Sequence, residues 1–199
     1  MKNSHGKLLK RIRDLEKELE KEKQRYAELL EKYENARICK LTKLPGRERL
    51  EEEHGILLAL NKRGASKAIS LVVIDVDHFK SVNDTHGHDV GDSVLMSVAK
   101  ALSSSKRPND VLVRWGGEEF ATLLADVHSL QSASAFVNRL RSVVKEDCRL
   151  PNGKSVTISA GVFIDKSGEM ELPELFKRAD KNMYLAKKHG RDRVVVSSS

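Results

Sequence analysis

Two aspartates close an apolar run in the first half of the chain. Residues 68–76 read Ala-Ile-Ser-Leu-Val-Val-Ile-Asp-Val, and Asp77 follows them. A short β-branched run predicts a buried strand, and alternation along it places Asp75 and Asp77 on one face, with Val76 opposite. Buried carboxylates are costly unless they are paired or bind a cation. The pair suits Mg²⁺, which takes one or two carboxylates and substrate phosphates; helix caps or a turn are the structural alternative.

A second acidic pair follows two glycines in the segment 115–120, which reads Trp-Gly-Gly-Glu-Glu-Phe. Strands over 111–115 and 118–125 would flank a two-residue turn at Gly116 and Gly117, which predicts a β-hairpin. Bare glycine backbone can approach a ligand and offer N–H groups to phosphate. If the hairpin lies beside the strand 68–76, Glu118 and Glu119 converge with Asp75, and a divalent cation must offset their repulsion. An ordinary turn is the alternative.

A polar segment, residues 78–92, is dense in hydrogen-bonding side chains and predicts a pocket. Asn83 can both donate and accept, and Asp92 only accepts. Such a pair suits the edge of guanine, whereas adenine has no donor at N1 and would leave the carboxylate unpaired. Zinc is a poor fit for the three histidines of this segment, because they lack helical pairing and a nearby cysteine; they are His78, His86 and His88.

One domain must position these residues, and residues 39–199 are long enough to form it. We expect helices over 46–62, 90–104, 130–147 and 172–189, with further strands over 155–164 and 193–196. The order of the core is β-α-β-β-α-β. This order predicts an α+β fold with a central, mostly antiparallel sheet.

The first 38 residues read instead as one charged helix with a narrow apolar stripe. The heptad a positions are Ile12, Leu19, Tyr26 and Tyr33, and the d positions are Leu8, Leu15, Glu22, Leu29 and Ala36. A stripe this narrow cannot build a core alone, and the flanking charges agree with a parallel pair. We therefore expect a coiled-coil homodimer. A solvated single helix held by charge pairs is the alternative.

Composition excludes several classes of protein. No stretch approaches the roughly 20 apolar residues of a membrane span, and the N-terminus lacks the apolar region of a secretory signal. Two cysteines cannot form a disulfide scaffold, so we expect a cytoplasmic protein without a membrane partner. The net charge of +7 suits a polyanion, either nucleotide or nucleic acid. Stacking aromatics and a basic recognition helix are lacking, so we expect no nucleic-acid partner.

The chain resembles the GGDEF-domain diguanylate cyclases of bacteria over about residues 39–196. The resemblance lies in four ordered segments: FKSVNDTHGHDVGD, RWGGEEF, ISAGV and ADKNMYLAKKHGRDRV. It implies a fold similar to nucleotide cyclases and polymerase palm domains. It also implies that two GTP molecules condense into cyclic di-GMP with release of two pyrophosphates. Because each GTP attacks the other, two domains must meet, and a coiled coil would raise their effective concentration.

The resemblance implies a catalytic centre with two divalent cations, Mg²⁺ or Mn²⁺. Asp75, Glu118 and the carbonyl of Val76 would hold them, and Glu118 is the family's candidate base for the 3′-hydroxyl. Glu119 belongs to the required pattern without a clear role. Lys80 would stabilise phosphate charge.

The resemblance also implies a nucleotide site. Asn83 and Asp92 would read guanine, and the other nucleotide contacts would be Phe79, His88, Gly116 and Gly117. Lys187 and Arg191, placed four apart on the last helix, would hold the terminal phosphates. An exposed basic helix end is the alternative for these two.

Arg107 and Asp110 match an Arg-x-x-Asp pattern that forms an inhibitory product site in the family. A second arginine from the following helix, either Arg139 or Arg141, would complete it. A surface ion pair is the alternative.

The chain departs from the family pattern where the domain begins. The family usually has Asp where Cys39 stands and Asn where Gly46 stands, so Arg47 would lose a partner. Cys39 is either a redox-sensitive thiol or inert. An inactive domain that only binds cyclic di-GMP or GTP is the alternative function, and the intact hairpin argues against it.

Overall fold

The computed structural model describes residues 2–65, 67–124, 127 and 129–199. Contacts divide the chain into two units, one ending at Ile38 and the other beginning at Cys39. Each is described by itself. Among the described residues, no helix combines the length and apolar character needed to cross a bilayer.

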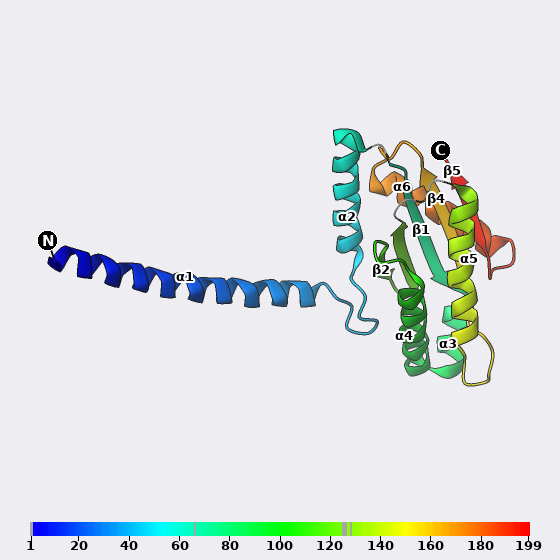
Figure 1. The fold of residues 1–199 in the computed structure, drawn as a ribbon. Coiled ribbons are helices and arrows are strands. Elements are labelled where there is room, and N and C mark those ends of the chain that lie inside the picture. Colours follow the sequence, from blue (N-terminus) through cyan, green and yellow to red (C-terminus); the bar gives the residue numbers. More distant parts are fainter. Residues whose placement is uncertain (1, 66, 125–126, 128) are drawn as a thin grey trace. The chain divides into compact units, whose positions relative to one another are not determined.

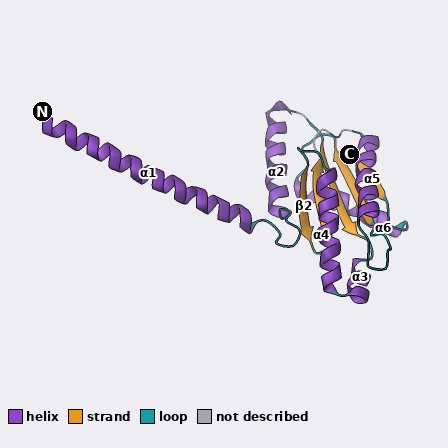
Figure 2. Cartoon of the chain, turned by 60° about the horizontal axis from the view of Figure 1, so that its bottom comes forward, coloured by secondary structure: helices purple, strands orange, loops and turns teal. Residues whose placement is uncertain are grey.

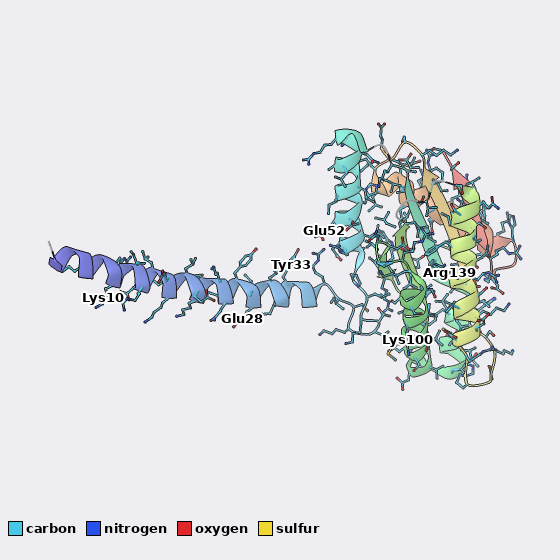
Figure 3. All side chains as sticks on the ribbon, viewed as in Figure 1. Lys10, Glu28, Tyr33, Glu52, Lys100 and Arg139 are labelled. Carbon is cyan, nitrogen blue, oxygen red and sulfur yellow. The ribbon has the colours of Figure 1, made fainter. Side chains whose placement is uncertain are left out.

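The first unit is a single helix, α1 (Lys2–Ala36). Figure 3 shows the side chains of Lys10, Glu28 and Tyr33 projecting from this helix. The apolar heptad residues are exposed within the single chain, namely Ile12, Leu15, Leu19, Tyr26, Leu29 and Tyr33. The side chains of Leu8 and Ala36 lie outside the described residues. The expected helix is confirmed, and its pairing into a coiled coil stays a prediction.

A five-stranded sheet organises the second unit, in the order β2-β3-β1-β4-β5 (Figure 1). Its strands are β1 (Ile69–Val76), β2 (Val111–Gly116), β3 (Glu119–Leu124), β4 (Ile158–Asp165) and β5 (Val194–Ser198). β1 pairs antiparallel with β3 and β4, β2 and β3 form a hairpin, and β5 runs parallel to β4. The predicted mostly antiparallel α+β fold is confirmed.

Five helices accompany the sheet: α2 (Arg47–Leu60), α3 (Phe79–His86), α4 (His88–Ser105), α5 (Leu130–Asp147) and α6 (Leu172–Lys188). A π-helical turn, Asn61–Ala65, follows α2. Figures 1 and 2 show α4 and α5 side by side across one face, where they contact each other. The core on that face is separate from the one that α2 and α6 cover.

β1 shows how the two cores set the directions of its side chains. Val72, Ile74 and Val76 belong to the core with α4 and α5, whereas Leu71 and Val73 belong to the core with α2 and α6. Strand alternation therefore turns the next residue of the second series, Asp75, toward α6. The position of the acid is a consequence of the apolar pattern that precedes it.

The structure differs from the sequence analysis in local detail. Residues 79–86, part of the segment predicted to form a polar pocket, form the helix α3, whose buried residues are Phe79 and Val82. α4 begins at His88 rather than at Val90. β4 begins at Ile158 instead of Ser155. The expected strand end at Ala125 lies outside the described residues.

Candidate active site

Asp75 lies near the end of β1 and is only 6% exposed. Its Oδ2 is 2.7 Å from the Nζ of Lys187, which comes from the last turn of α6. α6 can lie close to the sheet because β4 has Gly161 there. A Cβ at that position would meet backbone atoms of Ala179 and Met183. Close packing of helix on strand therefore brings Lys187 to the carboxylate.

The hairpin turn is one residue later than predicted. β2 continues through Gly116, which pairs with Glu119, so the turn residues are Gly117 and Glu118. The register shifts between Arg114 and Gly116, and this bulge accounts for the difference. Gly117 has φ of 48°, a left-handed conformation that glycine adopts without strain. Glu118 consequently lies at the tip of the hairpin.

The hairpin does place its acids beside β1. Asp75 is opposite Glu119 in the β1–β3 register, and the N–H of Val76 donates to the carbonyl of Glu118 over 3.3 Å. Burial raises the pKa of Asp75; Lys187 opposes this effect, and the charges of Glu118 and Asp77 add to it. The neighbouring acids therefore make the ionised form of Asp75 less favourable.

Glu119 is affected in the same way. Burial raises its pKa, the charges of Asp75, Asp180 and Glu118 raise it further, and Lys187 opposes them. Asp180 is an acid that the sequence analysis did not include. Its position on α6, two turns before Lys187, is the signal that could have identified it.

The donor set fits a hard divalent cation. The available groups are carboxylate and carbonyl oxygens, and one lysine only partly offsets the gathered negative charge. Within the described part of the chain, no three acidic, histidine or cysteine side chains form a complete metal site. Mg²⁺ does not require one, because it usually keeps waters and takes oxygens from substrate phosphates.

A second group of predicted residues lies where α3 and α4 meet. The Oδ1 of Asn83 is buried and has no hydrogen-bond partner among the described residues. It lies against Gly91, where a Cβ would collide with it, and the ring of Phe79 packs on the same glycine. Asp92 follows Gly91 on α4 and is exposed. A buried acceptor without a donor is costly, so this atom lacks the hydrogen bond that most buried polar groups have.

Lys80 and His88 have exposed side chains, on α3 and at the start of α4. Gly87, between these helices, has φ of 84° and lets the chain turn from one helix into the next. Among the described residues, no hydrogen bond or ion pair holds the side chain of Lys80 or His88 in place.

Arg191 is not on the last helix, which corrects our expectation. α6 ends at Lys188, and Arg191 follows in a loop with φ of 61°. The next residue, Asp192, anchors that loop. Its N–H donates to Asp77 Oδ2 over 3.0 Å, and its carboxylate accepts from Arg141 and Lys145.

The carboxylate of Asp77 is therefore held by hydrogen bonds within the fold. Besides the N–H of Asp192, it accepts hydrogen bonds from the hydroxyls of Thr157 and Ser159, at 2.7 and 2.6 Å. The two aspartates at the end of β1 thus differ. Asp77 holds the loop that carries Arg191, whereas Asp75 faces Lys187 and the acids of the hairpin.

The Arg107–Asp110 segment forms a tight turn at the other end of β2. Asp110 is buried, and its carboxylate accepts from the N–H of Arg107 over 2.9 Å. The guanidinium groups of Arg107 and Arg139 both lie over the ring of Phe136, 5.9 and 5.2 Å from its centroid. Figure 3 shows Arg139 on α5. Arg141 pairs with Asp192 instead, so of the two candidate arginines it is Arg139 that shares the ring of Phe136 with Arg107.

Sequence reasoning missed one residue that holds the hairpin. Arg114 donates from Nε and Nη2 to the carbonyl of Gly117, at 3.0 and 2.7 Å. Its Nη1 donates to the sulfur of Cys39 over 3.1 Å. The expected partner of position 39 was Arg47, which is instead 3.9 Å from Glu48. Arg114 stands two residues before the first glycine of the hairpin, and that spacing could have drawn attention to it.

The family model described as "Diguanylate cyclase, GGDEF domain" matches residues 36–193. The chain belongs to this GGDEF family. Diguanylate cyclase A of Treponema denticola is 40% identical over 146 residues, which cover 72% of this chain and 39% of that protein. The probable diguanylate cyclase DgcT of Escherichia coli is 39% identical over 28% of its length. The chain thus spans well under half of these curated GGDEF relatives.

Solved GGDEF structures resemble the whole chain. Diguanylate cyclase SiaD of Pseudomonas aeruginosa, in complex with its activator SiaC, has a TM-score of 0.78 and 35% identity. The match covers 98% of this chain and 75% of that one. The coiled coil and GGDEF domain of DgcB from Caulobacter crescentus, in complex with c-di-GMP, has a TM-score of 0.79 and 28% identity. That match covers 96% and 99% of the two chains.

Proposed function

We propose that this chain is a diguanylate cyclase, which joins two GTP molecules into cyclic di-GMP and releases two pyrophosphates. The 3′-oxygen of each GTP forms a bond to the α-phosphorus of the other. The bond from that phosphorus to the bridging oxygen breaks, and pyrophosphate leaves with the electron pair. The observation that carries this proposal is the gathering of Asp75, Glu118 and Glu119 at an open glycine turn, with Lys187 as counter-charge.

Asp75, Glu118 and the carbonyl of Val76 are the groups that would hold two Mg²⁺ or Mn²⁺ ions. Bound ions of this kind acidify an attacking hydroxyl and neutralise charge at phosphorus. Glu118, at the hairpin tip, would accept the 3′-hydroxyl proton. Glu119 lies beside Asp75 and adds negative charge that favours cation binding.

The terminal phosphates have three candidate cationic partners. Lys187 already faces the acidic centre, and Arg191 follows it in the loop anchored by Asp77. Lys80 extends from α3. A nucleotide that carries its own cations would give Asp75 a new partner and let Lys187 move to phosphate. Positioning of this kind supplies much of the rate in phosphoryl transfer.

Guanine is the base that the α3–α4 pocket favours. The unpartnered Oδ1 of Asn83 needs a donor, and the carboxylate of Asp92 only accepts. Guanine offers N1–H and its amino group to such acceptors, whereas adenine lacks a donor at N1. His88 and the packed ring of Phe79 complete the predicted nucleotide contacts.

Catalysis by two facing domains requires a dimer, and we propose that α1 provides it as a parallel coiled coil. The exposed apolar residues of α1 support this role, because a helix that buries none of them in its own chain gains from a partner. DgcB, whose structure matches this chain throughout, has a coiled coil joined to its GGDEF domain. The pairing would raise the effective concentration of the two catalytic domains.

We also propose that cyclic di-GMP inhibits the enzyme by binding at Arg107, Asp110 and Arg139. The shared position of the two guanidinium groups over Phe136 supports this assignment. Arginine presents a fork of donors that suits guanine O6 and N7 as well as phosphate.

The test is synthesis from GTP and Mg²⁺ by the full chain, stripped of co-purified nucleotide, with the products resolved by chromatography. We expect cyclic di-GMP from the wild type and none from Glu118→Gln. Inhibition by added product should be relieved by Arg107→Ala. Absence of synthesis, in a chain that still binds GTP or cyclic di-GMP, would overturn the proposal in favour of a receptor.

A further inference from the structure

Arg114 joins the active-site turn to the segment where the second unit begins. Its guanidinium gives two hydrogen bonds to the Gly117 carbonyl and one to the Cys39 sulfur. Its backbone N–H donates to the carbonyl of Pro45 over 2.9 Å. Arg114, a residue of β2, therefore contacts both the active-site turn and the segment around Cys39. All three of its side-chain hydrogen bonds come from one rigid guanidinium group.

The Gly117 carbonyl is a sensitive point of the site. It belongs to the peptide that leads into Glu118, so its direction sets where the Glu118 side chain begins. Gly116 and Gly117 are exposed and have no side chains to restrain the turn, and glycine loses more conformational freedom on ordering than other residues. A double hydrogen bond to this carbonyl restrains the peptide from outside.

Cys39 is well placed to orient the guanidinium. A compact turn holds it, with its N–H bonded to the carbonyl of Leu44 and its carbonyl to the N–H of Lys43, both at 2.8 Å. Leu44 is buried, which attaches the turn to the domain. The sulfur therefore has a defined position rather than that of a free surface thiol.

The surroundings of the sulfur favour the thiolate. Burial alone would raise the pKa of Cys39, but hydrogen bonds from Thr42, Arg114 and the backbone of Leu41 outweigh it and bring it to about 7. Among the groups that determine this pKa, Arg114 is the charged one. A thiolate binds a guanidinium more strongly than a thiol does.

We propose that Cys39 and Arg114 are positioning residues for the active-site turn: Cys39 orients the guanidinium, which fixes the Gly117 carbonyl and thereby Glu118. The consequence for the reaction rests on the proposed function, whereas the restraint on the turn does not. In this chain the guanidinium of Arg114 contacts a thiol, at a position where the family usually has Asp. Chemical modification of Cys39 should therefore loosen the turn without touching the nucleotide.

The test is alkylation of the full chain with iodoacetamide, followed by hydrogen exchange of residues 115–120 and by rate measurements. Cys39 should react, whereas Cys148 should not, because it is buried and burial raises its pKa to about 11. Exchange in 115–120 should become faster. The kcat should fall roughly 10- to 100-fold, as expected for a misplaced catalytic group, with little change in the KM for GTP.

Three variants complete the test. Cys39→Ser should show no response to the reagent, which assigns any effect to this sulfur. Cys39→Asp should retain the protected turn and most of the rate, whereas Arg114→Lys, with one point of contact, should lose both. The ratio of the wild-type rate to that of Cys39→Asp should rise from pH 6 to 8, because only the thiol ionises in that range.

Complete alkylation of Cys39 with unchanged exchange in 115–120 would overturn the inference, whatever the rate. A flat rate ratio across pH would overturn the role of the thiolate. Faster exchange in a protein that makes no cyclic di-GMP would support the restraint on the turn and refute the proposed function.

Discussion

A buried aspartate lies near each end of β1, and the surroundings shift the pKa values of these two aspartates in opposite directions. Asp75 belongs to β1 itself, while Asp165 is the residue of β4 paired with Ile69 at the other end. Burial raises the pKa of Asp75, and nearby acids add to the effect. Burial also acts on Asp165, but hydrogen bonds from the Met170 N–H and from Ser167 outweigh it and lower the pKa.

The difference separates a carboxylate that stabilises the fold from one that we propose to hold the catalytic cations. Asp165 accepts three hydrogen bonds from its own turn, at 2.7 to 3.1 Å. Among the described residues, the carboxylate of Asp75 is paired with the Nζ of Lys187, within a group of like charges. Sites of function commonly carry such strain at the expense of stability.

Exchange of each aspartate for asparagine should change stability in opposite directions, and this is the largest effect that we expect. Asp165→Asn places an amide donor against the N–H groups of its turn and should lower the free energy of unfolding by about 2 kcal/mol. Asp75→Asn removes an unfavourable charge, and the partly exposed Lys187 can turn to water. It should raise the free energy of unfolding by roughly 0.5–2 kcal/mol. Urea unfolding measures both, and equal signs would contradict the comparison.

The residues proposed to bind guanine lie where α3 and α4 meet, on the Asp75 side of β1, and Gly91→Ala should test their role. The new methyl group would displace Asn83 Oδ1 from its place. GTP affinity, measured by calorimetry with a non-hydrolysable analogue, should fall roughly 10-fold or more, as for other lost polar contacts to a substrate. Gly55→Ala is the control, because a Cβ there meets nothing within 4 Å. Equal affinities in the two variants would refute the pocket.

Lys187→Ala should change the affinities for Mn²⁺ and for GTP at the Asp75 end of β1 by a few fold. Loss of the lysine leaves Asp75 without its counter-charge, so Mn²⁺ should bind more tightly in the absence of nucleotide. GTP should bind more weakly, because a phosphate partner is gone. Electron paramagnetic resonance of free Mn²⁺ measures the first effect. Weaker Mn²⁺ binding would show that Lys187 does not compete for the carboxylate.

The pH dependence of the two asparagine variants should differ in sign, and this is the smallest effect. Because the pKa of Asp165 is lowered in the folded chain, its ionised carboxylate stabilises the fold above about pH 4, the pKa of an unfolded aspartate. This stabilisation is lost as the pH falls through the pKa of the folded state. The difference between wild type and Asp165→Asn should therefore shrink in acid. The raised pKa of Asp75 means that its cost appears only as the pH rises. Unfolding curves between pH 3 and 7 should show both trends.

Prediction from sequence worked where the signal was local or periodic. The range 130–147 was predicted for α5 and is the range observed, because its apolar residues repeat at helical spacing. Asp75 and Glu118 were expected to converge, and the β1–β3 pairing brings them together. The family motifs anticipated the fold and the fit of the acidic site to a divalent cation, while the guanine contacts of Asn83 and Asp92 stay a prediction.

What failed was decided by contacts between distant parts of the chain. Nothing near Asp77 in sequence shows that Thr157, Ser159 and Asp192 satisfy its carboxylate. The contact of Cys39 with Arg114 spans 75 positions. The bulge that moves the hairpin turn, and the early end of α6 before Arg191, depend on how each element packs.

The measurement that tests the central claim most directly is cyclic di-GMP synthesis by wild type, Asp75→Asn and Asp165→Asn, under conditions where all three are folded. The account predicts synthesis by the wild type and by Asp165→Asn, and none by the more stable Asp75→Asn. Synthesis by Asp75→Asn at the wild-type rate would contradict it, because the reaction would then not depend on the carboxylate at the end of β1.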